Sequence, residues 1–273
     1  MRLQKFEWYE ASPIKGNVDF ALLSDLHHGL TGNTHKNIEH LFRSLRSRLM
    51  GHRTCFIFAG DLISVKQENH FKLFRLFREY FQNYPAVMCY GNHDFWNYGK
   101  GCIPPGYDEI LSHRKEICEE FQLHDVDSGI FEMNDVAVVG FDGWYWKIDL
   151  LSNDRENMAL DFRGEDPFAF LNKKAYNDLD RILHLDYSKY RKKICVTHFP
   201  PFTENIKYYE HNANHSYMEW ITKNFDVMCV GHSHKKANFV ENGCLVLNCG
   251  SESGTGPNGM GIRECPRAVL FSI

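Results

Sequence analysis

Five apolar runs, each ending in a cluster of polar residues, constrain this chain more than any other feature. The runs lie at residues 18–23, 55–59, 86–90, 194–196 and 227–230. The clusters that follow them, in chain order, are Asp25-Leu26-His27, Gly60-Asp61, Gly91-Asn92-His93-Asp94, His198 and Gly231-His232-Ser233-His234. Short, near-continuous apolar runs are typical of strands that are buried on both faces of a parallel sheet. We therefore expect five buried strands.

Helical patterns alternate with these runs. Apolar residues recur at helical spacing in residues 36–49, 71–81, about 108–121 and about 166–182. Further strands are expected at residues 3–9, 136–140, 244–247 and 268–273, and the glycine-rich stretch 250–261 is expected to be a loop. Strands that alternate with helices indicate an α/β layered architecture. Because the chain has no internal repeat, linker or low-complexity tail, we expect residues 1–273 to form a single domain.

Composition narrows the class of protein. The net charge of −4 argues against bulk electrostatic attraction to duplex nucleic acid. Nine cysteines without a Cys-x-x-Cys pair are expected to be buried free thiols in a reducing compartment. The N-terminal residues lack the apolar core of a signal peptide, and no apolar run approaches the ~20 residues that span a bilayer. These features predict a cytoplasmic protein with no membrane contact.

The polar clusters contain the donor atoms that metal ions prefer. Open α/β sheets hold their ligands at the carboxyl ends of the strands, which is where all five clusters lie. Carboxylates, imidazoles and amide oxygens bind hard or borderline divalent cations. The seven candidate ligands are Asp25, His27, Asp61, Asn92, His198, His232 and His234. Seven donors exceed the needs of one tetrahedral ion but suit two ions, ~4 Å apart, that share a bridging carboxylate.

The alternative to a metal centre is a set of unrelated structural residues. A single histidine at a strand end is more often hydrogen-bonded than metal-bound, and Gly-Asp or Asp-x-His occur by chance. Gly-Asn-His-Asp and Gly-His-x-His are more specific. Gly60, Gly91 and Gly231 each directly precede one of these candidate donors, where the absence of a Cβ allows a sharp turn and a close approach. The complete ordered set therefore favours a metal centre.

From Asp25 to His234, the ordered motifs resemble those of the calcineurin-like metallophosphoesterase superfamily. The resemblance implies an α/β fold, a four-layer α/β/β/α sandwich, with a dimetal site at the carboxyl-terminal strand ends. It implies a metal-dependent phosphoric ester hydrolase, in which a metal-bound hydroxide attacks a phosphodiester or phosphomonoester. The cofactors would be two divalent ions, with manganese expected first and iron, zinc, nickel or magnesium as alternatives.

The resemblance also implies a role for each motif residue. Ligands of the first metal would be Asp25, His27 and His234, and ligands of the second would be Asn92, His198 and His232. The bridging carboxylate would be Asp61. His93 resembles the histidine that contacts the phosphate or protonates the leaving oxygen, and Asp94 would orient the His93 ring.

Departures from the family motifs bear on the substrate. Gly60-Asp61 is followed by Leu62-Ile63-Ser64, and Gly-Asn-His ends in Asp94 rather than Glu, which points away from Ser/Thr protein phosphatases. The sequence Phe199-Pro200-Pro201 is similar to the cyclic-nucleotide phosphodiesterase-like branch, and Ser24 to Gly29 has a parallel in the DNA-repair nucleases. A small phosphoester or nucleotide-like substrate is preferred. The alternatives are a DNA or RNA nuclease and a non-catalytic metal-binding scaffold for protein partners.

Substrate contacts are expected from three residues. His28 adjoins the first ligand pair, although such a neighbour more often packs away from a site. Trp144 and Tyr145 follow an expected strand end and could stack on a base, with core packing as the alternative. The loops 141–146, 199–216 and 250–261 are expected to line the pocket, because loops commonly hold specificity.

Overall fold

The computed structural model describes residues 7–10, 19–29, 32–63, 67–95, 106–143, 164–200, 215–234, 236–250, 252–255 and 262–273. Two six-stranded sheets make up most of the ordered core, and a two-stranded sheet of β12 (Glu252–Thr255) and β13 (Ile262–Cys265) lies apart from them. Within the described ranges, every helix is too short or too polar to cross a membrane.

The first sheet carries three of the predicted strands side by side. Its strands, in spatial order, are β1 (Glu7–Glu10), β14 (Arg267–Phe271), β2 (Phe20–Leu23), β3 (Cys55–Ala59), β4 (Ala86–Cys89) and β5 (His124–Asp125). The strands β2 to β5 are parallel, whereas β14 is antiparallel to β2. The carboxyl ends of β2, β3 and β4 therefore lie at one edge.

The second sheet brings the other two predicted strands to a matching edge. Its strands, in spatial order, are β10 (Ala237–Glu241), β11 (Cys244–Asn248), β9 (Val227–Val230), β8 (Lys192–Val196), β7 (Val136–Gly140) and β6 (Phe131–Met133). The central strands β11, β9, β8 and β7 are parallel, and the edge strands β10 and β6 are antiparallel to their neighbours.

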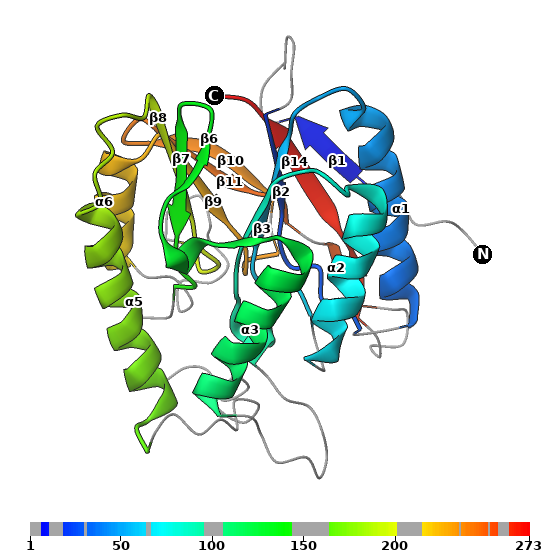
Figure 1. The fold of residues 1–273 in the computed structure, drawn as a ribbon, viewed down its shortest axis with the longest axis horizontal. Helices are drawn as coiled ribbons and strands as arrows, with labels where there is room; N and C mark the ends of the chain where they lie inside the picture. The colour runs from blue at the N-terminus through cyan, green and yellow to red at the C-terminus, as the bar shows by residue number, and fades with distance from the viewer. Residues whose placement is uncertain are drawn as a thin grey trace.

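Helices cover the outer face of each sheet (Figure 1). The first sheet is covered by α1 (Gly32–Leu49), α2 (Glu68–Tyr80) and α3 (Tyr107–Phe121). The second is covered by α5 (Pro167–Leu183) and α6 (His215–Asn224). Two short 3-10 helices, η1 (Asn92–Phe95) and η2 (Val126–Ser128), follow β4 and β5. This arrangement confirms the predicted four-layer α/β/β/α fold.

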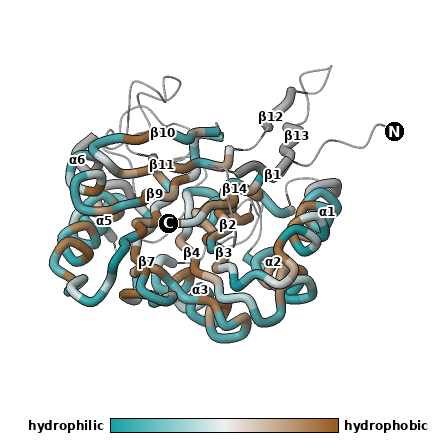
Figure 2. The backbone as a smooth tube through the Cα atoms, turned by 90° about the horizontal axis from the view of Figure 1, so that it is seen from above, coloured by the Kyte–Doolittle hydropathy of each residue, from teal (hydrophilic) through white to brown (hydrophobic). Residues whose placement is uncertain are grey.

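The strands β2, β3, β4, β7 and β9 are apolar along their length because both of their faces are buried, and their hydrophobic residues are drawn brown in Figure 2. Along β3, the residues Cys55, Ile57 and Ala59 face the second sheet, whereas Phe56 and Phe58 pack beneath the helices. The same alternation holds for the other central strands, as expected from the two-residue period of a strand. The helix-facing layer holds most of the buried aromatic residues, whereas the layer between the sheets is built mainly from aliphatic residues and cysteines, with Phe20 and Phe271 stacked on each other.

Several elements were missing from the sequence-based prediction. The strands β5, β6 and β10 are short or partly exposed, and the apolar content of α6 is weak, so none of them produces a clear periodic signal. The stretch 250–261 was predicted to be a loop, but β12 lies within it. Seven cysteines have described side chains; all seven are free, and six of them are buried, as expected.

Candidate metal centre

The candidate ligands lie on loops that continue directly from five strand ends. Past the ends of β2 and β3, the two chains stay paired, because the amides of Asp25, His27 and His28 donate to the carbonyl oxygens of Gly60, Asp61 and Leu62 at 3.0 Å each. This extended pairing places Asp25 and His27 beside Asp61. The first two clusters are therefore held together by backbone hydrogen bonds.

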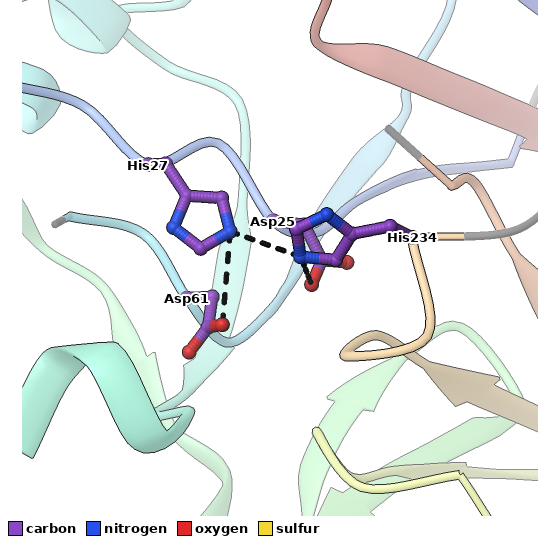
Figure 3. A group of neighbouring side chains, drawn as sticks. All are labelled: Asp25, His27, Asp61 and His234. Atoms are coloured by element: carbon purple, nitrogen blue, oxygen red, sulfur yellow. Dashed lines mark hydrogen bonds and ion pairs between the residues drawn. The ribbon is translucent and has the colours of Figure 1, made fainter. Parts of the chain in front are cut away.

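The first donor group consists of Asp25, His27, Asp61 and His234. Their ligand atoms lie within 4.8 Å of one another. His27 Nε2 is 3.2 Å from His234 Nε2 and 3.7 Å from Asp61 Oδ2, and His234 Nε2 is 3.5 Å from Asp25 Oδ1 (Figure 3). Figure 3 shows the two imidazoles and the two carboxylates converging from separate loops. This arrangement leaves donor atoms facing a common point, as a cation site requires.

The second donor group consists of Asp61, Asn92, His198 and His232. Ligand atoms of Asp61, His198 and His232 lie within 4.8 Å of one another. The Oδ1 atom of Asn92 lies 3.2 Å from His198 Nε2 and 3.1 Å from His232 Nδ1, so the amide oxygen joins the same cluster. Both donor groups share Asp61. The structure thus brings all seven predicted ligands together as two neighbouring groups.

The backbone at these residues is conformationally unusual. Eight non-glycine residues in the described ranges have a positive φ angle, and five of them belong to the donor groups. The five are Asp25 (52°), His27 (43°), Asp61 (49°), His232 (64°) and His234 (52°). The left-handed conformation costs about 1–2 kcal/mol per non-glycine residue. Clustered strain of this kind points to a functional site, where it aims side chains at a ligand.

Three glycines allow His198 to sit at the centre of the site. A Cβ on Gly60 would lie 2.5 Å from His198 Nδ1, a Cβ on Gly91 would lie 2.7 Å from His198 Cδ2, and a Cβ on Gly231 would lie 2.8 Å from His198 Nδ1. The Nδ1 atom of His198 also lies 2.9 Å from the carbonyl oxygen of Ala59, across the space between the sheets. The His198 ring thus lies close to all three glycines, although the Cβ of Gly91 would meet Asp61 first and that of Gly231 the Ala59 carbonyl oxygen.

Electrostatic coupling within the site is strong. Burial by itself would raise the pKa of Asp61, but the neighbouring His198 and His93 rings outweigh it and hold that pKa well below its usual range. Burial likewise opposes protonation of His198, yet the Asp61 carboxylate raises the pKa of His198 to about 9. Burial and the adjacent His93 hold the pKa of His27 well below its usual value. Because metal binding requires neutral imidazoles, it would be favoured as pH rises.

The donor set fits divalent cations. Asp25 and Asp61 are only 0% and 1% exposed, and their ion pairs in the described part of the chain are with histidines alone. A buried carboxylate requires a compensating charge. Two carboxylates, four imidazoles and one amide oxygen are the donors that manganese, iron or zinc would take.

His93 and Asp94 have different surroundings. The side chain of His93 is 21% exposed, its Nε2 lies 3.9 Å from Asp61 Oδ2, and its amide donates to Asp61 Oδ1 at 2.9 Å. Asp94, in contrast, is fully buried. Its carboxylate accepts the amides of Leu62, Ile63 and Gly91 and lies 3.1 Å from His70 Nε2.

The predicted contact between Asp94 and the His93 ring is not formed, because the Asp94 carboxylate binds other groups. The carboxylate of Asp94 is directed at the loop that follows Asp61 and at the amide before Asn92. Since η1 turns its second and third residues in different directions, adjacent side chains point apart. Asp94 thus holds the backbone on either side of the site through hydrogen bonds.

Of the three residues expected to contact the substrate, only His28 lies in the described part of the chain. His28 is 3% exposed, and its Nε2 lies 3.0 Å from His35 Nδ1 on α1, so it packs toward the helix layer. The burial of His28, followed by the effect of His35, lowers its pKa to about 4. Trp144 and Tyr145 lie outside the described residues, as does most of the loop 199–216.

Two supporting groups escaped the sequence-based prediction. Ser24 Oγ donates to Asp25 Oδ2 at 2.5 Å and lies 3.0 Å from Cys249 Sγ. Behind the second donor group, Arg114 forms a buried ion pair with Asp142. A usable signal was present for Arg114, because it lies between Ile110 and Ile117 on the apolar face of α3. A charge on that face indicates a buried partner.

Comparison with known proteins agrees with this geometry. Residues 18–236 match the family described as calcineurin-like phosphoesterase. Among solved structures, a phosphopantetheinyl hydrolase from Mycobacterium tuberculosis is 17% identical with a TM-score of 0.65, and the match covers 93% of this chain and 97% of that chain. The protein TT1561 of Thermus thermophilus is 15% identical with a TM-score of 0.53, and the match covers 86% and 90% of the two chains.

A putative 5′-nucleotidase from Staphylococcus aureus, solved in complex with alpha-ketoglutarate, is 12% identical with a TM-score of 0.50. That match covers 92% of this chain and 53% of the other. No curated protein matches the sequence. At these identities, the likeness to the solved structures shows the fold alone.

Proposed function

The chain belongs to the calcineurin-like phosphoesterase family, and from this premise we propose that it hydrolyses a small or nucleotide-like phosphoester with two divalent metal ions. The observation that carries the proposal is the pair of donor groups that share Asp61. The first group would hold one ion and the second would hold the other, with the Asp61 carboxylate between them. Manganese is the first ion to test.

Two bound ions would acidify water and neutralise negative charge on the phosphoryl oxygens. The chain's own residues supply the rest. The six ligands other than Asp61 would fix the ions at separate points, and their left-handed or strand-end backbones would keep those points constant. His93 lies beside the shared carboxylate, and its side chain is 21% exposed. Its imidazole would donate a hydrogen bond to a phosphoryl oxygen or a proton to the leaving oxygen.

The preferred substrate is small. The net charge of −4 does not favour a long polyanion. Two of the similar structures are named a phosphopantetheinyl hydrolase and a putative 5′-nucleotidase. Those names make small phosphodiesters and phosphomonoesters the first compounds to test. Trp144 and Tyr145 remain proposed contacts for a base or another flat group.

The direct experiment compares a chromogenic phosphodiester with the matching monoester in the presence of Mn²⁺. We expect turnover of at least one of them and its loss after chelation. His93→Ala should retain both ions and reduce turnover by about 100-fold or more, as expected for a proton donor. His184→Ala, which changes an exposed histidine at the end of α5, is the matched control and should leave turnover unchanged.

The same experiment separates the alternatives. A metal-binding scaffold would bind Mn²⁺ without hydrolysing any member of a broad phosphoester panel. A nuclease would cleave single-stranded DNA or RNA, and its rate would rise as the salt concentration falls. Loss of bound Mn²⁺ in His93→Ala would contradict the role proposed for His93.

A further inference from the structure

On the premise that the protein binds two ions as proposed above, we infer that Arg114 and Asp142 are positioning residues for the second donor group. They form a buried ion pair that sets the relative position of Asn92 and His198. Neither residue belongs to the candidate ligands, and both lie beneath the site rather than in it. The prediction that follows is selective: disturbing the pair should weaken one ion and spare the other.

The pair is well formed and almost fully buried. The Nη1 atom of Arg114 donates to both carboxylate oxygens of Asp142 at 2.8 Å, and Nη2 donates to Asp125 Oδ1. The side chains of Arg114 and Asp142 are 1% and 8% exposed. The guanidinium also lies over the Tyr90 ring, 4.8 Å from its centroid. The two terminal nitrogens of the planar guanidinium bind two different carboxylates, Asp142 and Asp125, so the group is fixed in direction as well as in position.

Asp142 connects the ion pair to two ligand-bearing strands at once. Its Oδ1 accepts the amide of Tyr90 at 2.8 Å, two residues before Asn92. Its carbonyl oxygen accepts the amide of His198 at 3.1 Å. These strands belong to different sheets, β4 to the first and β8 to the second. Asp142 therefore ties the two strand ends that carry Asn92 and His198 to a single buried residue.

A second connection passes through the Tyr90 ring. This ring lies between the Arg114 guanidinium and the His70 imidazole, with which it stacks at 5.0 Å and 10°. His70 Nε2 lies 3.1 Å from Asp94 Oδ1, and Asp94 Oδ2 accepts the amide of Gly91. The backbone at 90–92 is thus held from both sides. Movement of Arg114 would release the segment that directs Asn92 toward the second ion.

The first donor group rests on other supports. The Asp25 carboxylate accepts Ser24 Oγ and the amide of His232, and Ser24 in turn contacts Cys249. These contacts come from Ser24 after β2, His232 after β9 and Cys249 after β11. Arg114 and Asp142 are absent from that set. A change at the ion pair should therefore reach the second ion before it reaches the first.

The test is calorimetric titration of chelator-treated protein with Mn²⁺, for the wild type, Arg114→Met and Arg114→Lys. We expect Arg114→Met to weaken the second ion by about 10-fold or more while the first changes little, as seen when residues that support ligands are removed. Arg114→Lys keeps the charge without the two-pronged contact, so its effect should be smaller in the same direction. Electron paramagnetic resonance of the loaded protein should show less of the exchange-coupled ion pair in both variants.

Lys174→Met is the matched control. Lys174 belongs to the same charged network, with Asp127 and Asp178 as its partners, but it contacts neither ligand-bearing strand. This variant should lower the unfolding temperature and leave both Mn²⁺ affinities unchanged. Equal weakening of both ions by the Arg114 variants, or a loss of stability with no change in either affinity, would overturn the inference. Failure of the wild type to bind Mn²⁺ would instead contradict the proposed function on which the inference rests.

Discussion

The two donor groups are organised by different means, although they share Asp61. In the first group, Asp25, His27 and His234 all have a left-handed backbone. In the second, Asn92 begins a 3-10 helix and His198 directly continues a strand, so only His232 joins Asp61 in that conformation. The first group depends on strained loops with neutral hydrogen bonds behind them. The second depends on strand ends with a buried ion pair behind them.

The comparison shows two ways to preorganise a site. In the first group, the cost of preorganisation is strain in left-handed backbone conformations, which the surrounding structure must hold in place. In the second group, the cost is the desolvation of the Arg114 and Asp142 charges. Their pairing is directional but gives little net stability. Substitutions in the two groups should consequently differ in which ion they affect and in how far they lower the stability of the fold.

The largest expected effect comes from the residue that the groups share. Asp61→Asn removes the bridging charge, so both ions should bind roughly 100-fold more weakly or not at all. Removing a residue that only supports a ligand already costs about 10–100-fold in metal affinity, and Asp61 is itself a proposed ligand. Elemental analysis after gel filtration would measure Mn²⁺ per chain. Asp135→Asn, at an exposed carboxylate, is the control. Retention of one ion by Asp61→Asn would mean that the groups do not share a ligand.

The second prediction concerns the close packing of Gly91 against Asp61. Gly91→Ala would place a Cβ 2.3 Å from Asp61 Oδ1 and 2.5 Å from the Asp61 amide nitrogen, and the backbone atom cannot move away easily. We expect a loss of about 3 kcal/mol in the free energy of unfolding, at the upper end for overpacking. Gly51→Ala, with a φ of +85° and no atom within 4 Å of its Cβ, should lose only about 1 kcal/mol. Urea denaturation would measure both.

A third prediction uses pH to examine the loop of the first group. The pKa of His28 is lowered from 6.5 to about 4 by burial and by His35. The unfolded chain therefore binds more protons than the folded chain between these values, so stability should be fully present above pH 6.5 and fall as pH drops toward 4. On the order of 1–2 kcal/mol should be lost by pH 5 through His28 alone.

His28→Asn would isolate this contribution. Urea denaturation of chelator-treated wild type and variant at pH 7.5 and pH 5 should show a smaller pH-dependent loss in the variant. Parallel losses in the two proteins would mean that His28 is not the group responsible.

Sequence alone predicted most of the fold and which side chains gather at the candidate site, for a physical reason. Strand segments buried on both faces must be apolar, so β2, β3, β4, β9 and the last three residues of β8 stand out as continuous runs. The ligands directly follow those runs. Supporting residues leave no such pattern, because Asp142 and Cys249 are single residues whose partners are distant in the chain. The Asp94 contact was mispredicted because adjacency in sequence does not determine where a carboxylate points within a 3-10 turn.

The smallest effect is expected at Cys249, which supports the first donor group. Its substitution tests whether a change behind that group affects only the first ion. Its Sγ lies 3.0 Å from Ser24 Oγ and 3.1 Å from the Ser24 amide nitrogen, so Cys249→Ala leaves that buried amide without its acceptor. The expected loss of stability is about 1 kcal/mol. Since Ser24 donates to Asp25, the first ion should bind a few-fold more weakly and the second should be unaffected, the reverse of the order expected for Arg114→Met. Titration with Mn²⁺ would measure both, and Cys55→Ala, at another buried thiol, is the control. If Cys249→Ala weakened the second ion instead, the two groups would share a support and the distinction between them would fail.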